Sequence, residues 1–376
     1  MQKNIPFSAP DIADTDLEAI VEVIKSGWLA HGKYSRRLEE LFCEFTGAKY
    51  AATVSNCTAG LHLSCLAAGF GPGDEVIVPA QTHTATAHAV EYTGAKAVFA
   101  DVHPVIGNIL VEEIEAKLSS VTKGILSVHM AGYPCDMDGI LRICEKNNLI
   151  LIEDCAHALG TKYKGVHAGN FGTTGNFSFY PTKQITTGEG GVVISNDESA
   201  MEFINKHKAF GIDTPPEMRT KPGGYDVRGL GYNFRMTDFQ AALGAGQMER
   251  YDENLERRQA NGKLYCELLL NNEYVAFPEY TDGNSYFLFQ ILIKPPFSRD
   301  EVLLKLKKNA GIGVSIHYAT PVPLMTYYVD KYGYTHNEFP NSVKFGKEVI
   351  SLPVHSKMKK EDIIYVIEIL SNIMLN

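Results

Sequence analysis

No apolar run in the sequence reaches the roughly 18 residues that a membrane-spanning helix needs. The 376 residues include 35 basic and 44 acidic side chains, and no basic block stands out, so we expect neither a membrane nor a nucleic acid as partner. The polar start "MQKNIPFSAPDIADTD" lacks the apolar core of a signal peptide, and none of the seven cysteines forms a CxxC pair. We therefore expect a cytoplasmic protein with reduced thiols and no metal site.

Two common phosphate-binding motifs are also missing. No GxxxxGK[ST] is present. The stretch "GFGPGD" (residues 69–74) follows a helical pattern rather than a strand, and it lacks the last glycine of a dinucleotide fingerprint. These absences speak against a nicotinamide-dependent dehydrogenase.

Between residues 50 and about 200, short apolar runs typical of strands alternate with amphipathic patterns typical of helices. This rhythm predicts an α/β fold with a largely parallel sheet that is covered by helices on both faces. The predicted strands are "YAATVS", "EVIVPA", "KAVFADV", "KGILSVHM", "LILIEDC", "NFSFY" and "GVVISN".

The chain after residue 200 begins with a polar stretch rich in proline and glycine, residues 211–229, which predicts a long loop. A long helical pattern runs from Thr237 to about Leu270. Strand and helix patterns then alternate again, in "YFLFQILI", "EVLLKLKKNA", "VSIHY" and "KKEDIIYVIEILSNIM". We expect a large domain over residues 1–250 and a smaller α/β domain over residues 251–376, with the N-terminal segment packed against the small domain.

The stretch "VSNCTAG" joins a predicted strand to a helix that we expect to begin at Thr58, with Thr58 as its N-cap. The backbone N–H groups of Thr58 and Ala59 would then open a helix N-terminus, where partial positive charge and unpaired donors suit a phosphate. An ordinary capped helix explains the same pattern.

Two charged residues follow buried strands. Asp154 ends the run "LILIED", at the edge of the sheet where open α/β sheets bind ligands, although it could equally cap the next helix. Lys183 lies 29 residues later, between the apolar run "NFSFY" and the glycine-rich "TTGEGG". A lysine beside apolar groups loses its charge readily and can attack carbonyls, although an arbitrary loop lysine is usually solvated.

Together these sites fit one cofactor better than each does alone. A helix N-terminus for a phosphate, a carboxylate for a ring nitrogen and a lysine for an aldehyde are the groups that hold pyridoxal 5′-phosphate (PLP). The chain resembles the DegT-like nucleotide-sugar aminotransferases, PLP enzymes of the aspartate-aminotransferase fold (fold type I). The resemblance covers nearly the whole chain and is carried by "NCTAGLHL", "GPGDEVIVPAQTHTATAHAVEYTGAKAVFADV", "EDCAHALG", "FSFYPTKQITTGEGG" and "NFRMTDFQAALGAGQM".

The resemblance implies the following cofactor contacts. Lys183 is the covalent anchor and proton shuttle, Asp154 pairs with the ring nitrogen, and His157 lies near the ring oxygen. His83 takes the place of the aromatic ring that many relatives stack on the cofactor, which is a departure from the family pattern. The phosphate contacts are Thr58, Ala59 and Ser178.

The resemblance also implies a homodimer with shared active sites. Asn233 would reach the cofactor and Arg235 the substrate of the neighbouring subunit, and His317 and Tyr318 would border the sugar pocket, although a packed His-Tyr pair is an even alternative. The turn that reads "TTG" in relatives is "AHG" here, at Ala30, His31 and Gly32, so nucleotide contacts are not carried over to it.

The implied fold is a large domain with a mainly parallel seven-stranded sheet and a smaller C-terminal α/β domain. The implied reaction moves an amino group from L-glutamate to a keto group, at C4, of a nucleotide-linked deoxy-keto-sugar that feeds a surface polysaccharide such as lipopolysaccharide. Three alternatives are amination at C3, a PLP-dependent sugar dehydratase, and a PLP-binding regulator without activity. Lys183 speaks against the dehydratase, because such relatives carry histidine there, and the intact set of site residues speaks against the regulator.

Overall fold

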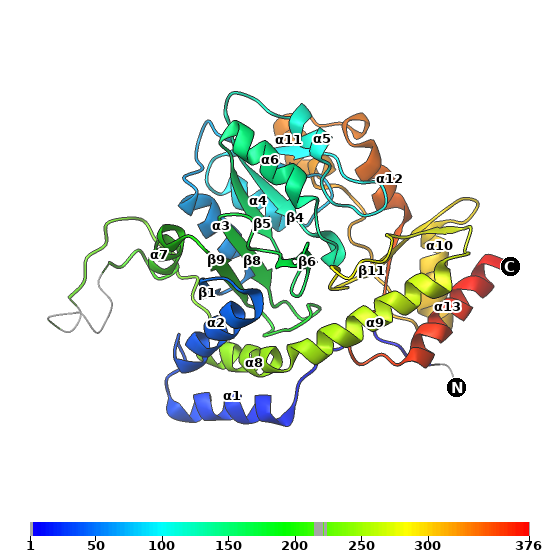
Figure 1. The fold of residues 1–376 in the computed structure, drawn as a ribbon, viewed down its shortest axis with the longest axis horizontal. Coiled ribbons are helices and arrows are strands. Elements are labelled where there is room, and N and C mark those ends of the chain that lie inside the picture. The colour runs from blue at the N-terminus through cyan, green and yellow to red at the C-terminus, as the bar shows by residue number, and fades with distance from the viewer. Residues whose placement is uncertain (1–2, 214–220, 222–223, 376) are drawn as a thin grey trace.

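The computed structural model describes residues 3–213, residue 221 and residues 224–375. Its centre is a seven-stranded sheet with the order β1-β9-β8-β5-β4-β2-β3 (Figure 1). Strand β9 is antiparallel to both of its neighbours, and the other adjacent pairs are parallel, which confirms the predicted mainly parallel sheet. The strands are β1 (Tyr50–Val54), β2 (Glu75–Pro79), β3 (Lys96–Ala100), β4 (Thr122–Val128), β5 (Ile150–Asp154), β8 (Thr174–Ser178) and β9 (Gly191–Ser195).

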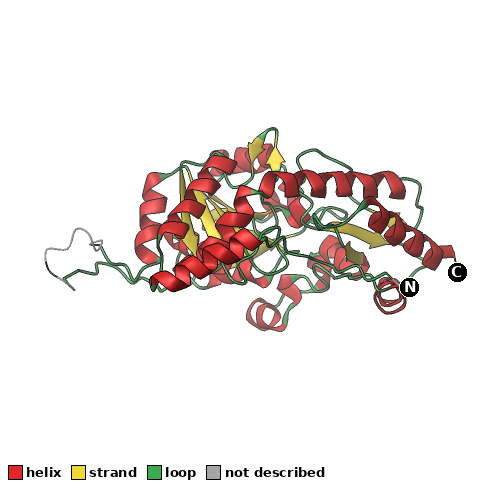
Figure 2. Ribbon diagram, turned by 90° about the horizontal axis from the view of Figure 1, so that it is seen from below, coloured by secondary structure: helices red, strands yellow, loops and turns green. Residues whose placement is uncertain are grey.

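Helices cover both faces of this sheet (Figure 2). Alternate residues of one strand enter different cores: Val76 and Val78 pack in one cluster with Leu61 of α3, and Ile77 packs in another with Ile140 of α6. Because both faces are buried, the strands read as continuous apolar runs. The covering helices are α2 (Lys33–Thr46), α3 (Cys57–Ala67), α4 (Thr84–Glu91), α5 (Val111–Ala116), α6 (Met137–Asn147), α7 (Glu198–His207) and α8 (Asp238–Glu249).

A second, antiparallel sheet lies in the C-terminal part, formed by β10 (Val275–Ala276), β11 (Phe289–Ile293) and β12 (Val349–Leu352). Ile291 of this sheet packs in one hydrophobic core with Tyr265 of α9 (Tyr251–Leu269) and Ile363 of α13 (Lys360–Leu375). The remaining elements are α10 (Arg299–Leu304), α11 (Thr326–Tyr332), α12 (Pro340–Glu348) and the hairpin of β6 (Lys162–Tyr163) and β7 (Val166–His167).

The N-terminal segment contacts both parts of the fold. Ile5 bridges to Ile312 and lies in the C-terminal core. Helix α2 instead packs in the core that contains α8, and α1 (Asp14–Ser26) lies alongside α8. The buried Asp16 of α1 accepts a hydrogen bond from Arg250, 2.7 Å away.

Two expectations differ from the structure. The helical pattern from Thr237 to Leu270 is two helices, α8 and α9, because Arg250 leaves the helical conformation (φ −109°, ψ 8°) where its side chain pairs with Asp16. The run "VSIHY" is not a strand, since Ser315 makes only an isolated bridge to Ser351.

Part of the loop predicted at residues 211–229 lies outside the described residues, at 214–220 and 222–223. Its described ends project from the body beside α7 and are joined by a bridge between Ile212 and Val227 (Figure 1). Among the helices of the described part, none has both the length and the apolar character to cross a membrane.

Candidate active site

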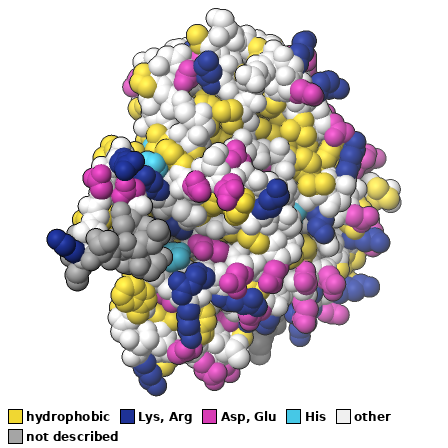
Figure 3. Space-filling model, turned by 60° about the vertical axis from the view of Figure 1, so that its left-hand side comes forward, with side chains coloured by type: hydrophobic (Ala, Val, Ile, Leu, Met, Phe, Trp, Pro, Cys, Tyr) yellow, Lys and Arg dark blue, Asp and Glu magenta, His cyan; other side chains and the backbone are white. Residues whose placement is uncertain are grey.

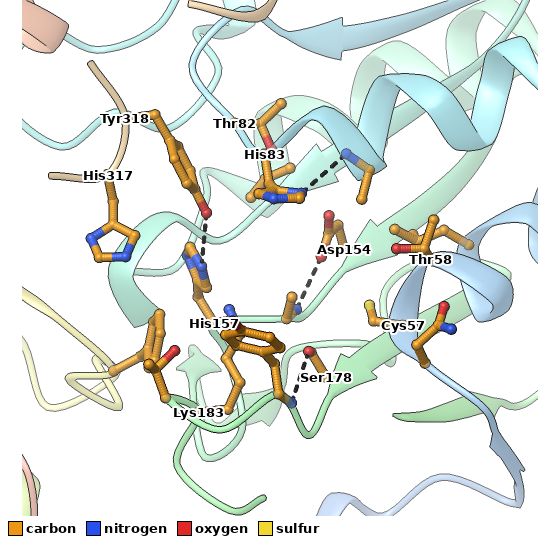
Figure 4. A pocket seen from close by; sticks show the side chains of 18 of the residues that line it. Cys57, Thr58, Thr82, His83, Asp154, His157, Ser178, Lys183, His317 and Tyr318 are labelled. Carbon is orange, nitrogen blue, oxygen red and sulfur yellow. Dashed lines mark hydrogen bonds between the residues drawn. The ribbon is translucent and has the colours of Figure 1, made fainter. Parts of the chain in front are cut away.

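A cavity of about 650 Å³ opens where β5 and β8 end beside α3 and α4. Segments far apart in the sequence line it, including the C-terminal pair His317 and Tyr318 (Figure 4). Of the residues predicted from the sequence, the cavity brings together Thr58, His83, Asp154, His157, Ser178, Lys183, His317 and Tyr318. Ala59, Asn233 and Arg235 do not line it.

Asp154 is the last residue of β5 and is 4% exposed. One carboxylate oxygen accepts a hydrogen bond from the Thr86 hydroxyl (2.7 Å), and the other accepts from the backbone N–H of Ala156 (3.0 Å). Thr82 supports Thr86 from one turn earlier, with 2.8 Å between the hydroxyl oxygens. These partners are neutral, so none of them supplies a countercharge to the carboxylate, and that place is left for a cation in the cavity. Thr82 and Thr86 were missed from the sequence: Thr82 precedes His83, the N-cap of α4, so no helical spacing links it to Thr86.

Lys183 lies in the turn that joins β8 to β9. Its backbone N–H donates to the carbonyl of Tyr180, and its side chain places Nζ 4.4 Å from the centre of the Phe287 ring. Burial lowers the pKa of Lys183 to about 8, although the Asp154 carboxylate acts in the opposite direction. A large neutral fraction is therefore present near pH 8, and the neutral amine is the nucleophilic form.

The helix beside the cavity begins differently from the prediction. Helix α3 starts at Cys57, and its N-cap is Asn56 rather than Thr58. The side chain of Asn56 accepts from the backbone N–H of Ala59 (2.8 Å), so this N–H already has a partner. Thr58 faces the cavity in the first turn, and Ser178 faces it from the end of β8 (Figure 4).

One glycine lets β9 approach the first turn of α3. A Cβ atom on Gly191 would lie 2.6 Å from the carbonyl oxygen of Phe177 and 2.8 Å from the backbone nitrogen of Cys57. A side chain at this position would push the helix N-terminus away from the strand. Gly191 therefore lets the end of the lysine turn lie against the first turn of α3.

His157 is a buried, neutral imidazole at the floor of the site. Burial lowers its pKa well below the ordinary range, and the nearby Lys183 and His317 lower it further. Its Nδ1 accepts from the backbone N–H of Ala131 (3.3 Å), which leaves the proton on Nε2. The Tyr318 hydroxyl lies 3.4 Å from Nε2.

The other two cavity histidines are also held neutral. Burial lowers the pKa of His317 to about 3, and its ring stacks on Phe7 at 5.7 Å. His83 caps α4, where its Nδ1 accepts from the backbone N–H of Ala85 (3.2 Å). Burial and the charge of Lys183 lower the pKa of His83 as well.

We expect the protein to lose stability as the pH falls from about 6.5 toward 4. His157, His167 and His317 are neutral when folded, and the pKa values of the last two are about 4 and 3. The unfolded chain binds protons at these sites in this window and the folded chain does not, so the free energy of unfolding rises with pH there. The slope is at most about 1.4 kcal/mol per pH unit for each histidine.

Urea unfolding at pH 7, 6 and 5 measures this slope. His129 acts in the opposite direction, because Cys135 and Glu153 raise its pKa to about 10 against the effect of burial. It offsets part of the slope between pH 7 and 6, where the unfolded chain takes up this proton, and little of it below pH 6, where both states are protonated. His167→Gln is the matched variant: glutamine can keep the bonds to Gly160 and Ala168, and the slope should fall by one histidine's share. A free energy of unfolding that does not change between pH 7 and pH 5 would contradict the assignment.

Asn233 and Arg235 lie outside the cavity and are exposed. Arg235 donates to the side chain of Asn233 (3.2 Å) and lies 5.2 Å from the ring of Phe210. Asn233 makes an isolated bridge to Ala209, and Arg235 lines a hollow together with Ile212 and Val227 of the projecting segment. Figure 3 shows hydrophobic side chains reaching the surface among charged ones on one face of the molecule. Within a single chain, therefore, neither Asn233 nor Arg235 contacts Lys183.

The residues of the cavity fit PLP. Asp154 offers a buried carboxylate with neutral partners, Lys183 offers a partly neutral amine, and a helix N-terminus opens beside Thr58. These are the groups that a protonated ring nitrogen, an aldehyde and a phosphate require.

Comparison with known proteins gives a consistent result. Residues 10–371 match the DegT/DnrJ/EryC1/StrS aminotransferase family. The chain is 35% identical to the spore coat polysaccharide biosynthesis protein SpsC of Bacillus subtilis, over 98% of this chain and 97% of that protein. It is also 35% identical to GDP-perosamine synthase of Escherichia coli O157:H7, over 97% of both chains. The PLP form of Spr1654 from Streptococcus pneumoniae has a TM-score of 0.90 with 28% identity, covering 99% of this chain and 98% of that one.

Proposed function

Because the chain belongs to the DegT/DnrJ/EryC1/StrS aminotransferase family, we propose that it transfers an amino group from L-glutamate to the C4 keto group of a nucleotide-linked deoxy sugar. It is a PLP-dependent sugar aminotransferase with the type I fold. The donor, the nucleotide-linked acceptor and the C4 position are the parts that we propose. The likeness to GDP-perosamine synthase supports a nucleotide-linked sugar, and the likeness to SpsC supports a role in polysaccharide synthesis.

One observation carries the proposal: a lysine with a lowered pKa and a buried carboxylate share one cavity, at the ends of neighbouring strands. When bound, PLP supplies an aldehyde and an electron-accepting ring. Asp154 would hold the proton on the ring nitrogen, and Lys183 would anchor the cofactor and then move a proton as its amine becomes free. His157 would donate its Nε2 proton to the ring oxygen.

The remaining cavity residues would place the two ligands. Thr58, with the N–H groups at the start of α3, and Ser178 would bind the phosphate. Ala59 is the weaker part of this phosphate site, because Asn56 already accepts from its N–H. His83 would lie over the cofactor ring, and His317 and Tyr318 would border the sugar. Tyr318 is fixed there by Gln81, whose side chain donates to its backbone carbonyl (2.7 Å).

Mass spectrometry of the products tests the substrate class. The protein is incubated with L-glutamate and a panel of nucleotide-linked 4-keto and 3-keto sugars. An amino sugar from the 4-keto substrates supports the proposal, and one from the 3-keto substrates alone assigns the alternative position. A deoxygenated sugar without nitrogen would indicate a dehydratase, and no product from any substrate would favour a regulator.

We also propose that the active unit is a homodimer in which Asn233 and Arg235 complete the partner's site. The two residues are exposed and lie outside their own cavity, and Arg235 lines a hollow together with Ile212 and Val227 of the projecting segment. Helix α1 adds an apolar stripe on the outside of the molecule: Leu17, Val21 and Ile24 are 53%, 45% and 58% exposed. Exposed stripes of this kind mark protein interfaces.

Mixing two inactive variants tests the shared site. In a random mixture of Lys183→Ala and Arg235→Ala subunits, half of the dimers are mixed, and each of these has one intact site of two, so we expect about a quarter of the wild-type activity. The matched control pairs Lys183→Ala with Asp154→Asn, which leaves a defect in every site and should restore nothing. An absence of recovery in verified mixed dimers would place Arg235 outside the partner's site.

A further inference from the structure

Phe287 contacts the reactive lysine from the C-terminal part of the chain. It lies two residues before β11 and is 4% exposed. The centre of its ring is 4.4 Å from Nζ of Lys183 and 4.5 Å from the ring of His157. The sequence did not mark this residue, and the roles proposed above do not include it.

The backbone on both sides of Phe287 is tied to other elements. Arg258 of α9 donates to the carbonyls of Tyr286 (3.3 Å) and Val354 (3.1 Å), and it is itself 4% exposed. On the other side, the N–H of Leu288 donates to the carbonyl of Ala131 (3.2 Å). The ring is thus held in place from two directions, while the lysine beside it has a long, flexible side chain.

A cation over an aromatic face is stabilised by the negative charge of the ring face, and more strongly when water is excluded. The other groups that act on the ammonium are Asp154 from β5 and Cys57 from α3, which both favour its charged form. The histidines of the cavity are His83, His157 and His317, and Tyr180, Glu189 and Tyr318 are the other titratable residues that line it. Because the three imidazoles are neutral and Asp154 would be paired with the cofactor's ring nitrogen, the ring of Phe287, 4.4 Å from Nζ, is the contact that would hold a free ammonium.

We propose that Phe287 is a positioning residue that holds the free side chain of Lys183 during the part of the cycle in which the lysine is not attached to the cofactor. The ring keeps the ammonium inside the cavity after the lysine has taken up a proton, so that the same proton can be returned to the substrate. This inference rests on the proposed role of Lys183 as the covalent anchor.

The test uses the protein reconstituted with pyridoxamine 5′-phosphate, in which Lys183 is free. Acetic anhydride labels amines in their neutral form, and mass spectrometry of the Lys183 peptide between pH 6 and 10 gives the midpoint of its titration. In Phe287→Leu, which keeps an apolar side chain but removes the ring face, we expect the midpoint to fall by about half a unit to one and a half units. Phe287→Tyr keeps the ring face and should keep the midpoint.

Phe289→Leu is the matched control, because Phe289 belongs to the C-terminal core and not to the cavity. It should change stability and leave the midpoint of Lys183 unchanged. A midpoint in Phe287→Leu equal to that of the wild type and of Phe289→Leu would overturn the positioning role. Borohydride reduction of the wild-type PLP form tells a failure of the Phe287 role from a failure of the Lys183 role. An adduct on a different lysine refutes Lys183 as the anchor. An adduct on Lys183, together with an unchanged midpoint in Phe287→Leu, refutes only the role of Phe287.

Discussion

Replacing Lys183 by alanine is expected to abolish steady-state transamination and to leave the fold intact. The side chain has two roles in the proposed mechanism, covalent anchor and proton carrier, and the second alone is worth about 10²- to 10⁴-fold in rate. The turn that carries it does not depend on the side chain, because it is held by the backbone bond to Tyr180 and by Thr186, whose hydroxyl donates to the carbonyl of Phe179 (2.9 Å). Activity and thermal unfolding measure the two effects separately.

Lys208→Ala is the matched control for this variant. Lys208 is also a buried lysine with a lowered pKa, but it lies outside the cavity, where it donates to the carbonyl of Thr53 (3.1 Å) and pairs with Glu39 (3.5 Å). Its loss leaves Glu39 without that partner, so this variant should unfold more easily and keep the rate per folded molecule. Borohydride reduction of the yellow wild-type protein should place the adduct on Lys183, and an adduct elsewhere would contradict the assignment.

The seven strands could be predicted because burial on both faces determines which residues they contain. A strand buried on both faces must be apolar throughout, and "EVIVPA" and "LILIEDC" follow this rule. Asp154 and Lys183 could be expected in one site for a related reason, whereas the roles of His83, His157, His317 and Tyr318 rested on the family resemblance alone. A parallel sheet brings the carboxyl ends of its strands to one edge, so Asp154 after one strand and Lys183 after the next had to come close together.

The features that were missed depend on contacts between residues distant in the sequence. Nothing in the pattern from Thr237 to Leu270 shows that Arg250 will leave the helix to pair with Asp16, which is 234 positions away. In the same way, Phe287 resembles any other core aromatic in "YFLFQILI" until the fold places its ring beside Lys183. The N-cap is a local error: Asn56 and Thr58 are both good caps, and the pattern does not choose between them.

Asp154→Asn is expected to slow the first half-reaction by about a hundredfold to a thousandfold, the range that one preorganised charged or polar group contributes at a reacting centre. The asparagine can keep the shape of the site. Its amide oxygen can still accept from the N–H of Ala156, and its amide nitrogen can donate to the Thr86 hydroxyl, which can turn toward Thr82. The variant should therefore bind PLP and unfold at the wild-type temperature.

The loss of charge has a second, independent consequence. The Asp154 carboxylate raises the pKa of Lys183 against the effect of burial. In Asp154→Asn the titration midpoint of the free lysine should therefore lie below the value of about 8. The bond to the N–H of Ala156, which asparagine can keep, would not by itself move this midpoint.

Glu153, the residue before Asp154, provides the control for Asp154→Asn. Glu153 points to the other face of β5, where it accepts from the N–H groups of Gly169, Phe171 and Gly172 and faces His129 at 3.0 Å. In Glu153→Gln an amide group would point at N–H donors, so stability should fall by about 1–3 kcal/mol while the half-reaction rate of the folded protein stays near the wild-type value. Stopped-flow loss of the yellow colour with L-glutamate gives both rates. If Asp154→Asn reacts as fast as Glu153→Gln, then Asp154 only holds the turn through its bond to Ala156, because charge at the end of β5 would then have no effect on the reaction.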